Sequence, residues 1–553
     1  MRYDDLVTAA TVGLSRRPLP AAALSGPAGS RDPADALLEA AALHVAARRA
    51  GMVLPQAAPV PPPMPPDRAP ELPPRAARIL RKAAGDAEVL TDLLVATAEA
   101  GFLAPAPLLP ALLDAAVRSV ALRPAVNAAL GSRGRWLAAH RPDWRRVTDQ
   151  AEGGPAGPAG TRPPADPRAW ETGSRAERVA YLTGLRTRNP VVGRELLAAG
   201  WSRENAEERG QLLATLTRGL SLEDEDFLEA ALDDRAAAVA ATARDLLARL
   251  PESAFRQRVD ARAADLLRLK STGTRQWLEV SLPDDTPGPE LARDGISGSP
   301  PGAGIGAGAW LLTQLIAAAP LDEWPRRFAM SAREVVSLEI RPAPGPGEGG
   351  TASSPASLAV DVHAGWRLAA VRQGDARWAI ALLSGDGPLL APGRPPAAWA
   401  GNHDLAAVLD RATRASVAAA LFPRLTRVAS RMAGTKADSR ASATAIGELA
   451  AWPGPWPTAA ADFVLSMVAA SLSAQGAVRV LQGLLASAGR HAPVTGPRDY
   501  AAELIRLSNA PDCAYPWIAV LRRAADTLAL RRAFQAALTE TSPQHDQPRA
   551  VEP

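Results

Sequence analysis

The residues that could carry acid–base, metal or nucleophilic chemistry are few and widely separated. Histidine occurs at positions 44, 140, 363, 403, 491 and 545, without the HExxH or His-x3-His spacing that brings two imidazoles to one metal ion. Cys513 is the only cysteine, so neither an intrachain disulfide nor a multi-cysteine metal site can form. No G-x-S-x-G elbow is present. The sequence therefore predicts a non-enzyme, with no catalytic residue, metal ligand or cofactor.

Four adjacent carboxylates stand in "EDED" at positions 223–226. Paired carboxylates can do acid–base or metal chemistry, but negative charge is also favoured at the start of a helix. The preceding "SLED", from Ser221, resembles a capping box. We therefore favour a structural role, in which Glu225 and Asp226 could also pair with an arginine such as Arg209 across a repeat boundary.

The stretch "GAGIGAG" (302–308) is the only candidate for a phosphate-binding loop. It lacks the G-x-G-x-x-G spacing, follows no strand signal, and no Walker Gly-Lys-Ser/Thr occurs anywhere in the chain. A flexible glycine loop is the favoured interpretation. Any dependence on ATP would then belong to a partner protein.

The densest local cluster of tryptophan and arginine lies at 133–146. Trp136 and Trp144 stand eight residues apart, and the flanking basic residues are Arg133, Arg135, Arg141, Arg145 and Arg146. Arginine with tryptophan is typical of protein-interaction anchors, and aromatic plus basic residues can also stack nucleobases. We favour core packing of the tryptophans, then protein docking, and last nucleic-acid binding.

Bulk composition favours helices and excludes a strongly charged partner surface. Of the 553 residues, 47% are apolar but only 4% are aromatic, and alanine supplies much of the apolar content. The 62 basic residues face 58 acidic ones, so the pI of 9.6 indicates no general field for nucleic acid. The N-terminus lacks an apolar signal core, and the apolar run 310–319 is too short to span a bilayer. We expect a cytoplasmic protein.

The elements that must position these residues are helix pairs. In "LEAALDDRAAAVAATARDLLARLPES" (228–253), an acidic turn separates two helical patterns, and helices are expected at 235–250 and 252–269. Asp234 can cap the first of them, while Asp233 can reach toward an arginine of an adjacent repeat. Leucine doublets recur 34 residues apart, at 212 and 246. The pattern predicts an all-α chain: a HEAT-like α-solenoid of irregular helix pairs with Pro/Gly-rich loops.

The organisation expected along the chain follows from these patterns and from composition. The segments are an N-terminal helical region (1–148) with a proline-rich strap (53–74), a flexible linker (149–168), a HEAT-like repeat core (169–282), a loop (283–306), a C-terminal helical region (307–540) and a disordered tail (541–553). The best strand candidate is "VVSLEI" (335–340), although a helix fits nearly as well.

Several motifs resemble one bacterial family of unknown function, domain family 5691. They are "LVTAATVGLSRRPLP" (6–20), "GSRGRWLAAHRPDW" (131–144), "WETGSRAERVAYLTGLRTRNP" (170–190) and "LSLEDEDFLEAALDDR" (220–235). The recognisable positions are Trp136, Trp144, Trp170, Arg178, Arg186, Glu225, Asp226, Asp234 and Arg235, which with Arg133 are the candidate interaction or structural residues. The resemblance weakens beyond residue 280.

The resemblance also implies partners. Members of the family resemble partners of a MoxR-type AAA ATPase, a von Willebrand A-type protein and a SWIM zinc-finger protein, by genomic neighbourhood. This implies a non-catalytic, protein-binding scaffold or adaptor in a chaperone-like system. The alternative is a HEAT-like nucleic-acid-binding or DNA-repair protein that binds a duplex through arginines. The nearly equal number of acidic residues disfavours this alternative.

Overall fold

The structure is a computed structural model in which two compact units are separated at residues 65 and 66. It describes residues 3–19, 25–26, 29–30, 32–51, 64, 66–67, 69–149, 168–283, 288–302, 304–344, 354–391, 394, 398–430, 436–474 and 477–539. Most of the expected strap, nearly all of the expected linker and the whole expected tail lie outside these residues. The expected N-terminal region (1–148) spans parts of both units.

The first unit is small and has a sparse core. Its elements are α1 (Tyr3–Val12), α3 (Pro33–Arg49) and a two-residue antiparallel ladder of β1 (Ser25–Gly26) with β2 (Gly29–Ser30). Ala9, Leu19 and Ala36 are buried, whereas Leu38 and Leu43 are 68% and 64% exposed. So few buried apolar side chains contribute little to the free energy of folding.

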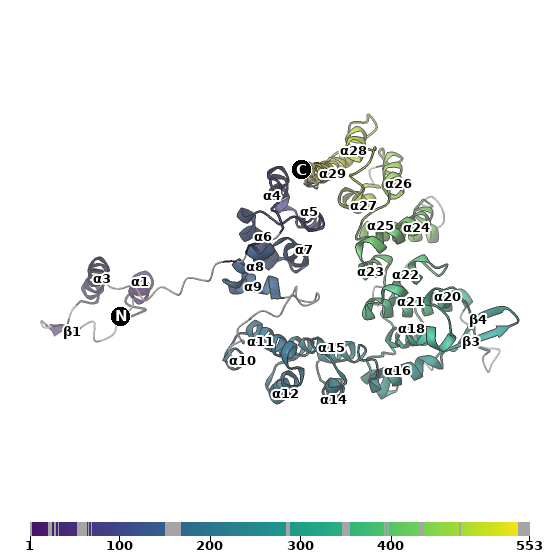
Figure 1. Cartoon of the computed structure of the whole chain (residues 1–553), viewed down its shortest axis with the longest axis horizontal. Coiled ribbons are helices and arrows are strands. Elements are labelled where there is room, and N and C mark those ends of the chain that lie inside the picture. Colours follow the sequence, from purple (N-terminus) through teal and green to yellow (C-terminus); the bar gives the residue numbers. More distant parts are fainter. Residues whose placement is uncertain are drawn as a thin grey trace, which may run out of the picture. The chain divides into compact units, whose positions relative to one another are not determined.

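The second unit is mostly helical (Figure 1). Its first helices are α4 (Pro74–Lys82), α5 (Ala87–Glu99), α6 (Leu109–Arg118), α7 (Arg123–Ala129), α8 (Gly131–Ala139) and α9 (Pro142–Asp149). The expected repeat core holds α10 (Arg168–Glu171), α11 (Arg175–Arg188), α12 (Pro190–Gly200), α13 (Ala206–Ala214), α14 (Glu225–Ala231), α15 (Ala237–Leu247) and α16 (Ala254–Ala264).

The remaining helices begin with a short one inside the segment expected to be a loop (283–306). They are α17 (Pro289–Arg293), α18 (Ala307–Ala318), α19 (Glu323–Phe328), α20 (Ala332–Val336), α21 (Pro355–Gln373), α22 (Ala376–Ser384), α23 (Asn402–Ala407), α24 (Arg411–Ala429), α25 (Lys436–Ala451), α26 (Thr458–Ala469), α27 (Ala477–His491), α28 (Tyr500–Ser508) and α29 (Tyr515–Thr539). None of the described helices combines the length and apolarity needed to cross a bilayer.

Local capping explains where many of these helices begin. The Asp86 carboxylate accepts hydrogen bonds from the backbone N–H groups of Glu88 and Val89, which α5 would otherwise leave unsatisfied. Asn189 caps α12 in the same way, ahead of a proline at its first position. At the expected capping box, the Ser221 N–H donates to the Asp224 carboxylate at 3.1 Å, and a short 3-10 turn precedes α14.

A three-stranded sheet corrects the all-α prediction. Its order is β3 (Leu267–Thr272), β4 (Arg275–Val280) and β5 (Glu339–Pro342), with β3–β4 antiparallel and β4–β5 parallel. The helix expected over 252–269 ends at Ala264 because the following residues alternate with period two, which places Leu267 and Leu278 on the core face. The expected strand 335–340 is also displaced, since α20 takes its first two residues.

The last helix of the unit packs on its first helices, as Figure 1 shows. One buried cluster joins Phe534, Ala537 and Leu538 of α29 to residues 72–147 of the chain. Ion pairs also join α5 to later helices: Arg490 of α27 pairs with Glu88, and Arg411 of α24 pairs with Glu99 at 3.3 Å. Segments more than 300 residues apart in sequence therefore share one core.

Candidate protein-binding surfaces

The tryptophan–arginine cluster at 133–146 divides between core and surface. Trp144 on α9 is 7% exposed, its Nε1 donates to the Asp114 carboxylate at 2.7 Å, and the Arg141 guanidinium lies 4.0 Å from its ring centroid. Trp136 on α8 is half-buried and meets the His140 ring edge to face at 4.4 Å. Trp144 therefore packs in the core of the first helices, while Trp136 lies at its margin.

Arg133 anchors a preceding segment rather than extending freely from α8. Its guanidinium pairs with Glu71 at 2.9 Å, and its backbone N–H donates to the Asp67 carboxylate at 3.3 Å. Asp67 also accepts a hydrogen bond from the Ser132 N–H. The start of α8 thus receives a carboxylate at its positive end, an arrangement that stabilises the helix.

Trp170 and Arg178 belong to the first of a series of ion pairs across the repeat core. The Arg178 guanidinium makes two hydrogen bonds to the Glu204 carboxylate, one of them at 2.9 Å, and lies 4.6 Å from the Trp170 ring centroid. These hydrogen bonds hold the pKa of Glu204 below its usual range. The contact joins α10 and α11 to the turn that follows α12.

The next pair joins α13 to the turn before α15. Arg209 donates to both oxygens of Asp234 at 2.7 and 2.9 Å, and Asp234 also accepts from the Ala236 N–H at 2.8 Å. The hydrogen bonds from Arg209 lower the pKa of Asp234. Asp234 is therefore not the N-cap of α15, which is Ala236, but it holds the turn before that helix through the ion pair and the Ala236 N–H.

The expected pairing of Arg209 with Glu225 or Asp226 is wrong. Glu225 instead accepts a hydrogen bond from the Ala254 N–H at 2.5 Å, at the start of α16. Asp226 lies exposed in the first turn of α14, and Arg235 is exposed in the turn before α15. The acidic run therefore stabilises helix starts on two elements.

Arg186 is fully buried and completely hydrogen-bonded. It makes a two-bond ion pair with Asp224 at 2.9 and 2.7 Å and also donates to backbone carbonyls. The carbonyls belong to Pro190, Leu216, Arg218 and Gly219. A planar guanidinium has five N–H donors in a fixed fork, which this cage of acceptors satisfies.

The series ends in a network around Asp294. This buried carboxylate accepts from Arg258 at 2.7 Å and from Arg262 at 2.6 Å. Burial raises the pKa of Asp294, but the hydrogen bonds from these two arginines outweigh it, and the pKa is lowered overall. Arg293 pairs with Asp233 at 2.8 Å, so Asp233 does contact an arginine from a later element. These arginines of the repeat core, and Arg293 after it, are therefore paired with carboxylates of the protein itself.

A second buried network lies in the C-terminal half, where the sequence had suggested nothing. The Arg367 guanidinium of α21 is fully buried and donates to the Ala400 carbonyl at 2.7 Å and to the Asn402 side chain at 2.8 Å. Glu448 of α25 accepts from the Asn402 N–H at 2.7 Å and lies 3.1 Å from His403 Nδ1. These residues come from separate helices, so no spacing in the sequence could reveal them.

His403 is the residue of this network that reaches the surface, with 38% of its side chain exposed. Its hydrogen bond with Glu448 raises its pKa. An imidazole oriented by a buried carboxylate can transfer protons, but that chemistry also needs a substrate site. Across the part of the chain that is described, no group of three or more His, Cys, Asp or Glu residues is placed to hold a metal ion.

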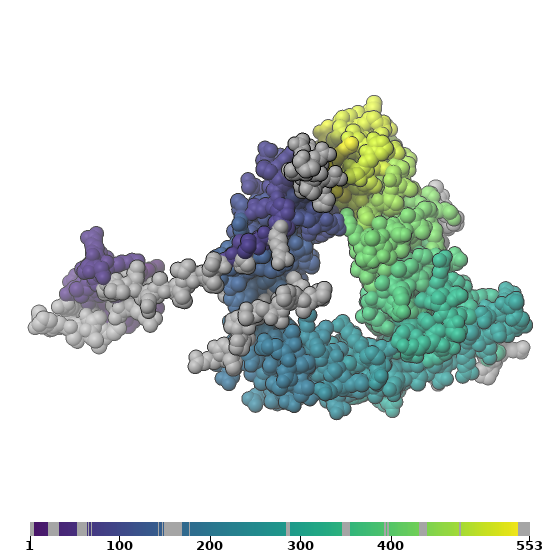
Figure 2. All heavy atoms as spheres, viewed as in Figure 1, coloured from purple at the N-terminus to yellow at the C-terminus, as the bar shows by residue number. Residues whose placement is uncertain are grey.

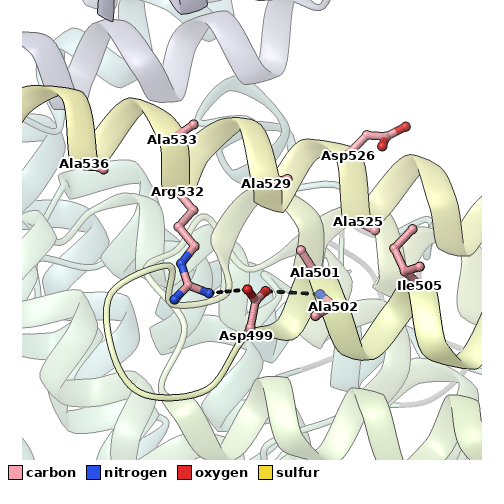
Figure 3. A pocket seen from close by; sticks show the side chains of 10 residues that line it. All are labelled: Asp499, Ala501, Ala502, Ile505, Ala525, Asp526, Ala529, Arg532, Ala533 and Ala536. Carbon is pink, nitrogen blue, oxygen red and sulfur yellow. Dashed lines mark hydrogen bonds and ion pairs between the residues drawn. The ribbon is translucent and has the colours of Figure 1, made fainter. Parts of the chain in front are cut away.

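An apolar groove lies between α28 and α29, on the surface coloured yellow in Figure 2. Figure 3 shows Ala525 of α29 beside Ile505 of α28, with Ala529 and Ala533 farther along α29. The volume of the groove is about 370 Å³. An ion pair of 2.6 Å between Arg532 and Asp499 lies at one end of it. Small side chains along a helix let another backbone approach closely.

A second groove, of about 590 Å³, lies between α19, the start of α20, and α22. Asp322, Pro325 and Arg326 line it, together with Arg377, Ile380, Ala381 and Ser384. Ser331, Ala332, Arg333 and the buried Trp378 complete the lining. The linings of both grooves thus combine apolar and charged side chains.

The fold and these surfaces define a mostly helical protein with internal ion-pair networks and shallow surface grooves. The chain belongs to the family of unknown function DUF5691, whose family model matches residues 5–538. None of the curated proteins compared with the chain is significantly similar to it.

Proposed function

We propose that the chain is a non-catalytic scaffold that binds protein partners through the groove between α28 and α29. The observation that carries the proposal is the apolar lining of this groove, where Ile505 is 37% exposed beside the alanine row of α29. Exposed apolar grooves on helices favour an amphipathic helix from another protein. The partners that the family resemblance implies are a MoxR-type AAA ATPase, a von Willebrand A-type protein and a SWIM zinc-finger protein.

We further propose that the helices within residues 169–282 form HEAT-like pairs that ion pairs hold together. The ion pairs Arg178–Glu204 and Arg209–Asp234 support this, because each joins one helix of the segment to a later turn. They also argue against the nucleic-acid alternative. Arginines already paired with carboxylates release fewer counterions on binding a phosphate backbone.

The test is gel filtration of the purified chain with each purified partner, in ATP and in ADP. We expect one partner to co-elute, and Ile505→Glu or Ala529→Glu to weaken its capture about tenfold, because each buries a charge in the interface. Ala470→Glu is the matched control, since Ala470 is exposed at the end of α26.

The outcomes separate the parts of the proposal. If the unaltered chain binds none of the partners with either nucleotide, the scaffold role is wrong. If both groove variants bind as well as the unaltered chain, the scaffold role stands and the groove assignment is wrong. Salt-dependent binding to duplex DNA would instead favour the alternative function.

A further inference from the structure

We infer that the second groove, between α19, α20 and α22, binds an acidic amphipathic helix of a protein partner. The inference deepens the proposed function and rests on it in one respect, namely that the ligand is a protein. It begins with charge: the groove is lined by Arg326, Arg333 and Arg377 but by only one carboxylate, Asp322. The lining therefore has an excess of positive charge.

The three arginines are available to a ligand to different degrees. Arg333 is exposed and forms no ion pair with any carboxylate of the described chain. Arg326 and Arg377 are 67% and 79% exposed and pair with neighbours on their own helices, Arg326 with Glu323 at 2.5 Å and Arg377 with Asp375 at 3.3 Å. Exposed local pairs contribute about 0–1 kcal/mol, so a ligand's carboxylates can replace them.

The remaining acids near the groove are already engaged. Asp322 pairs with Arg256 at 2.6 Å as well as with Arg326 at 3.2 Å. Glu334 accepts hydrogen bonds from the N–H and hydroxyl of Ser331 at 2.7 Å. Neither carboxylate forms an ion pair with Arg333.

The apolar part of the lining determines which kind of anionic ligand fits the groove. Ile380 and Ala332 are half-buried and apolar, so they favour aliphatic side chains from the ligand. Trp378 is only 1% exposed, which leaves no aromatic face in the groove for stacking a base. A lining that combines apolar side chains with three arginines suits a helix that has leucines on one face and glutamates beside them.

The experiment measures fluorescence anisotropy of a labelled peptide with the full-length chain at low salt. The probe is a 15-residue amphipathic helix with leucines at i, i+3 and i+7 and glutamates at the flanking positions. Its comparison peptide has lysines in place of the glutamates. We expect the acidic peptide to bind at least about tenfold more tightly than the basic one, because only it complements the arginines.

Variants locate the binding to the groove. Arg333→Glu together with Arg377→Glu should weaken binding of the acidic peptide about tenfold or more. Both positions lie in the first turn of a helix, where glutamate is favourable, so the fold should be kept. Arg479→Glu, an exposed first-turn arginine of α27, is the matched control and should leave binding unchanged.

Equal affinity for the two peptides, unchanged binding by the double variant, or equal competition by single-stranded DNA would each overturn the inference. A thermal melt of each variant shows whether a loss of binding reflects unfolding. If no peptide binds while a purified partner still co-elutes with the chain, the groove inference fails and the proposed function stands. If neither binds, both fail.

Discussion

Two arginines with completely buried guanidinium groups differ in how fully they are hydrogen-bonded. Every N–H of Arg186 has an acceptor, either Asp224 or a backbone carbonyl. Nη1 of Arg367 is buried without a hydrogen-bond partner, although Nε and Nη2 have theirs. A buried ion pair is costly to break because it leaves an uncompensated charge, so the two sites respond differently to substitution.

Arg186→Lys should destabilise the protein by about 3–5 kcal/mol, because an ammonium cannot reach all the acceptors that the guanidinium satisfies. Urea unfolding followed by circular dichroism measures the effect. Arg235→Lys, at an exposed position, is the control and should change stability by less than about 0.5 kcal/mol. Equal midpoints for the two variants would show that the cage around Arg186 does not contribute to stability.

Asp92 of α5 gives stability an unusual dependence on pH. Burial raises the pKa of Asp92 from 3.8 to about 6, against the opposing effect of Arg531 and Arg411. The contribution of Asp92 is therefore present below pH 4 and is lost as the pH rises through 6. Burial lowers the pKa of the neighbouring His491 from 6.5 to about 3, so its contribution is present above pH 6.5 and is lost as the pH falls.

Asp92→Asn should raise the thermal midpoint at pH 8 and change it little at pH 4. At pH 8 the substitution removes a charge that is disfavoured where it is buried, whereas at pH 4 the native carboxyl is already neutral. Differential scanning calorimetry at the two pH values measures this. A lower midpoint at pH 8 would mean that the attraction of Arg531 and Arg411 outweighs the burial of Asp92.

At the scale of elements, helices were predictable and the sheet was not. The helix expected at 235–250 from 3.6-residue periodicity occurs as α15, and most of the one expected at 252–269 occurs as α16. In the sequence, Leu266 falls where the apolar face of the expected helix 252–269 would continue past Ala264. This concealed the alternation of apolar and polar residues in β3 and β4. A signal for a β-hairpin was nevertheless present. Gly273, with φ of 59°, lies in the turn between two runs in which apolar and polar residues alternate.

The ion pairs across the repeat core were predictable in kind but not in partner. Acidic turns after helices indicated contacts to arginines of other helix pairs, and Asp233 and Asp234 make such contacts. Which arginine reaches which acid depends on how the helix pairs are offset, and one sequence does not encode that offset locally. The network of Arg367, Asn402 and Glu448 was beyond prediction for the same reason.

Phe534→Ala on α29 should destabilise the first helices of the second unit selectively. Phe534 is 1% exposed in the cluster that holds α4 and α5, and losing a buried phenylalanine costs about 3–5 kcal/mol. Hydrogen exchange followed by mass spectrometry should show that the substitution speeds exchange in residues 74–99 more than in residues 175–247. Ala529→Ser, at an exposed position of the same helix, is the control. Uniformly faster exchange would contradict the selective effect.

At the scale of the whole molecule, the contact of α29 with α4 and α5 was not predictable. The expected organisation treated the N-terminal and C-terminal helical regions as separate. The apolar pattern of a helix shows which of its faces is buried but does not show which other helix covers that face. The ion pair that joins α5 to α27, Glu88 with Arg490, likewise links residues about 400 apart in sequence. Long-range pairing of this kind depends on the path of all the intervening helices.

A chain shortened to residue 510, which lacks α29, should lose protection of residues 74–147 against limited proteolysis. The first helices would then expose the apolar side chains that Phe534 and Leu538 cover. A chain shortened to residue 539 keeps α29 and is the control. Equal cleavage patterns for the two would show that the first helices form a stable core without α29.

The same contact has a consequence for biosynthesis. Val147 is the last residue of the early cluster to leave the ribosome before Phe534, and roughly 390 residues separate the two. At about 5–20 residues per second, the nascent helices wait roughly 20–80 s for the side chains that complete their interior. Throughout that interval the growing polypeptide exposes the apolar leucine side chains of this cluster, which makes it a natural client for ribosome-associated holdases.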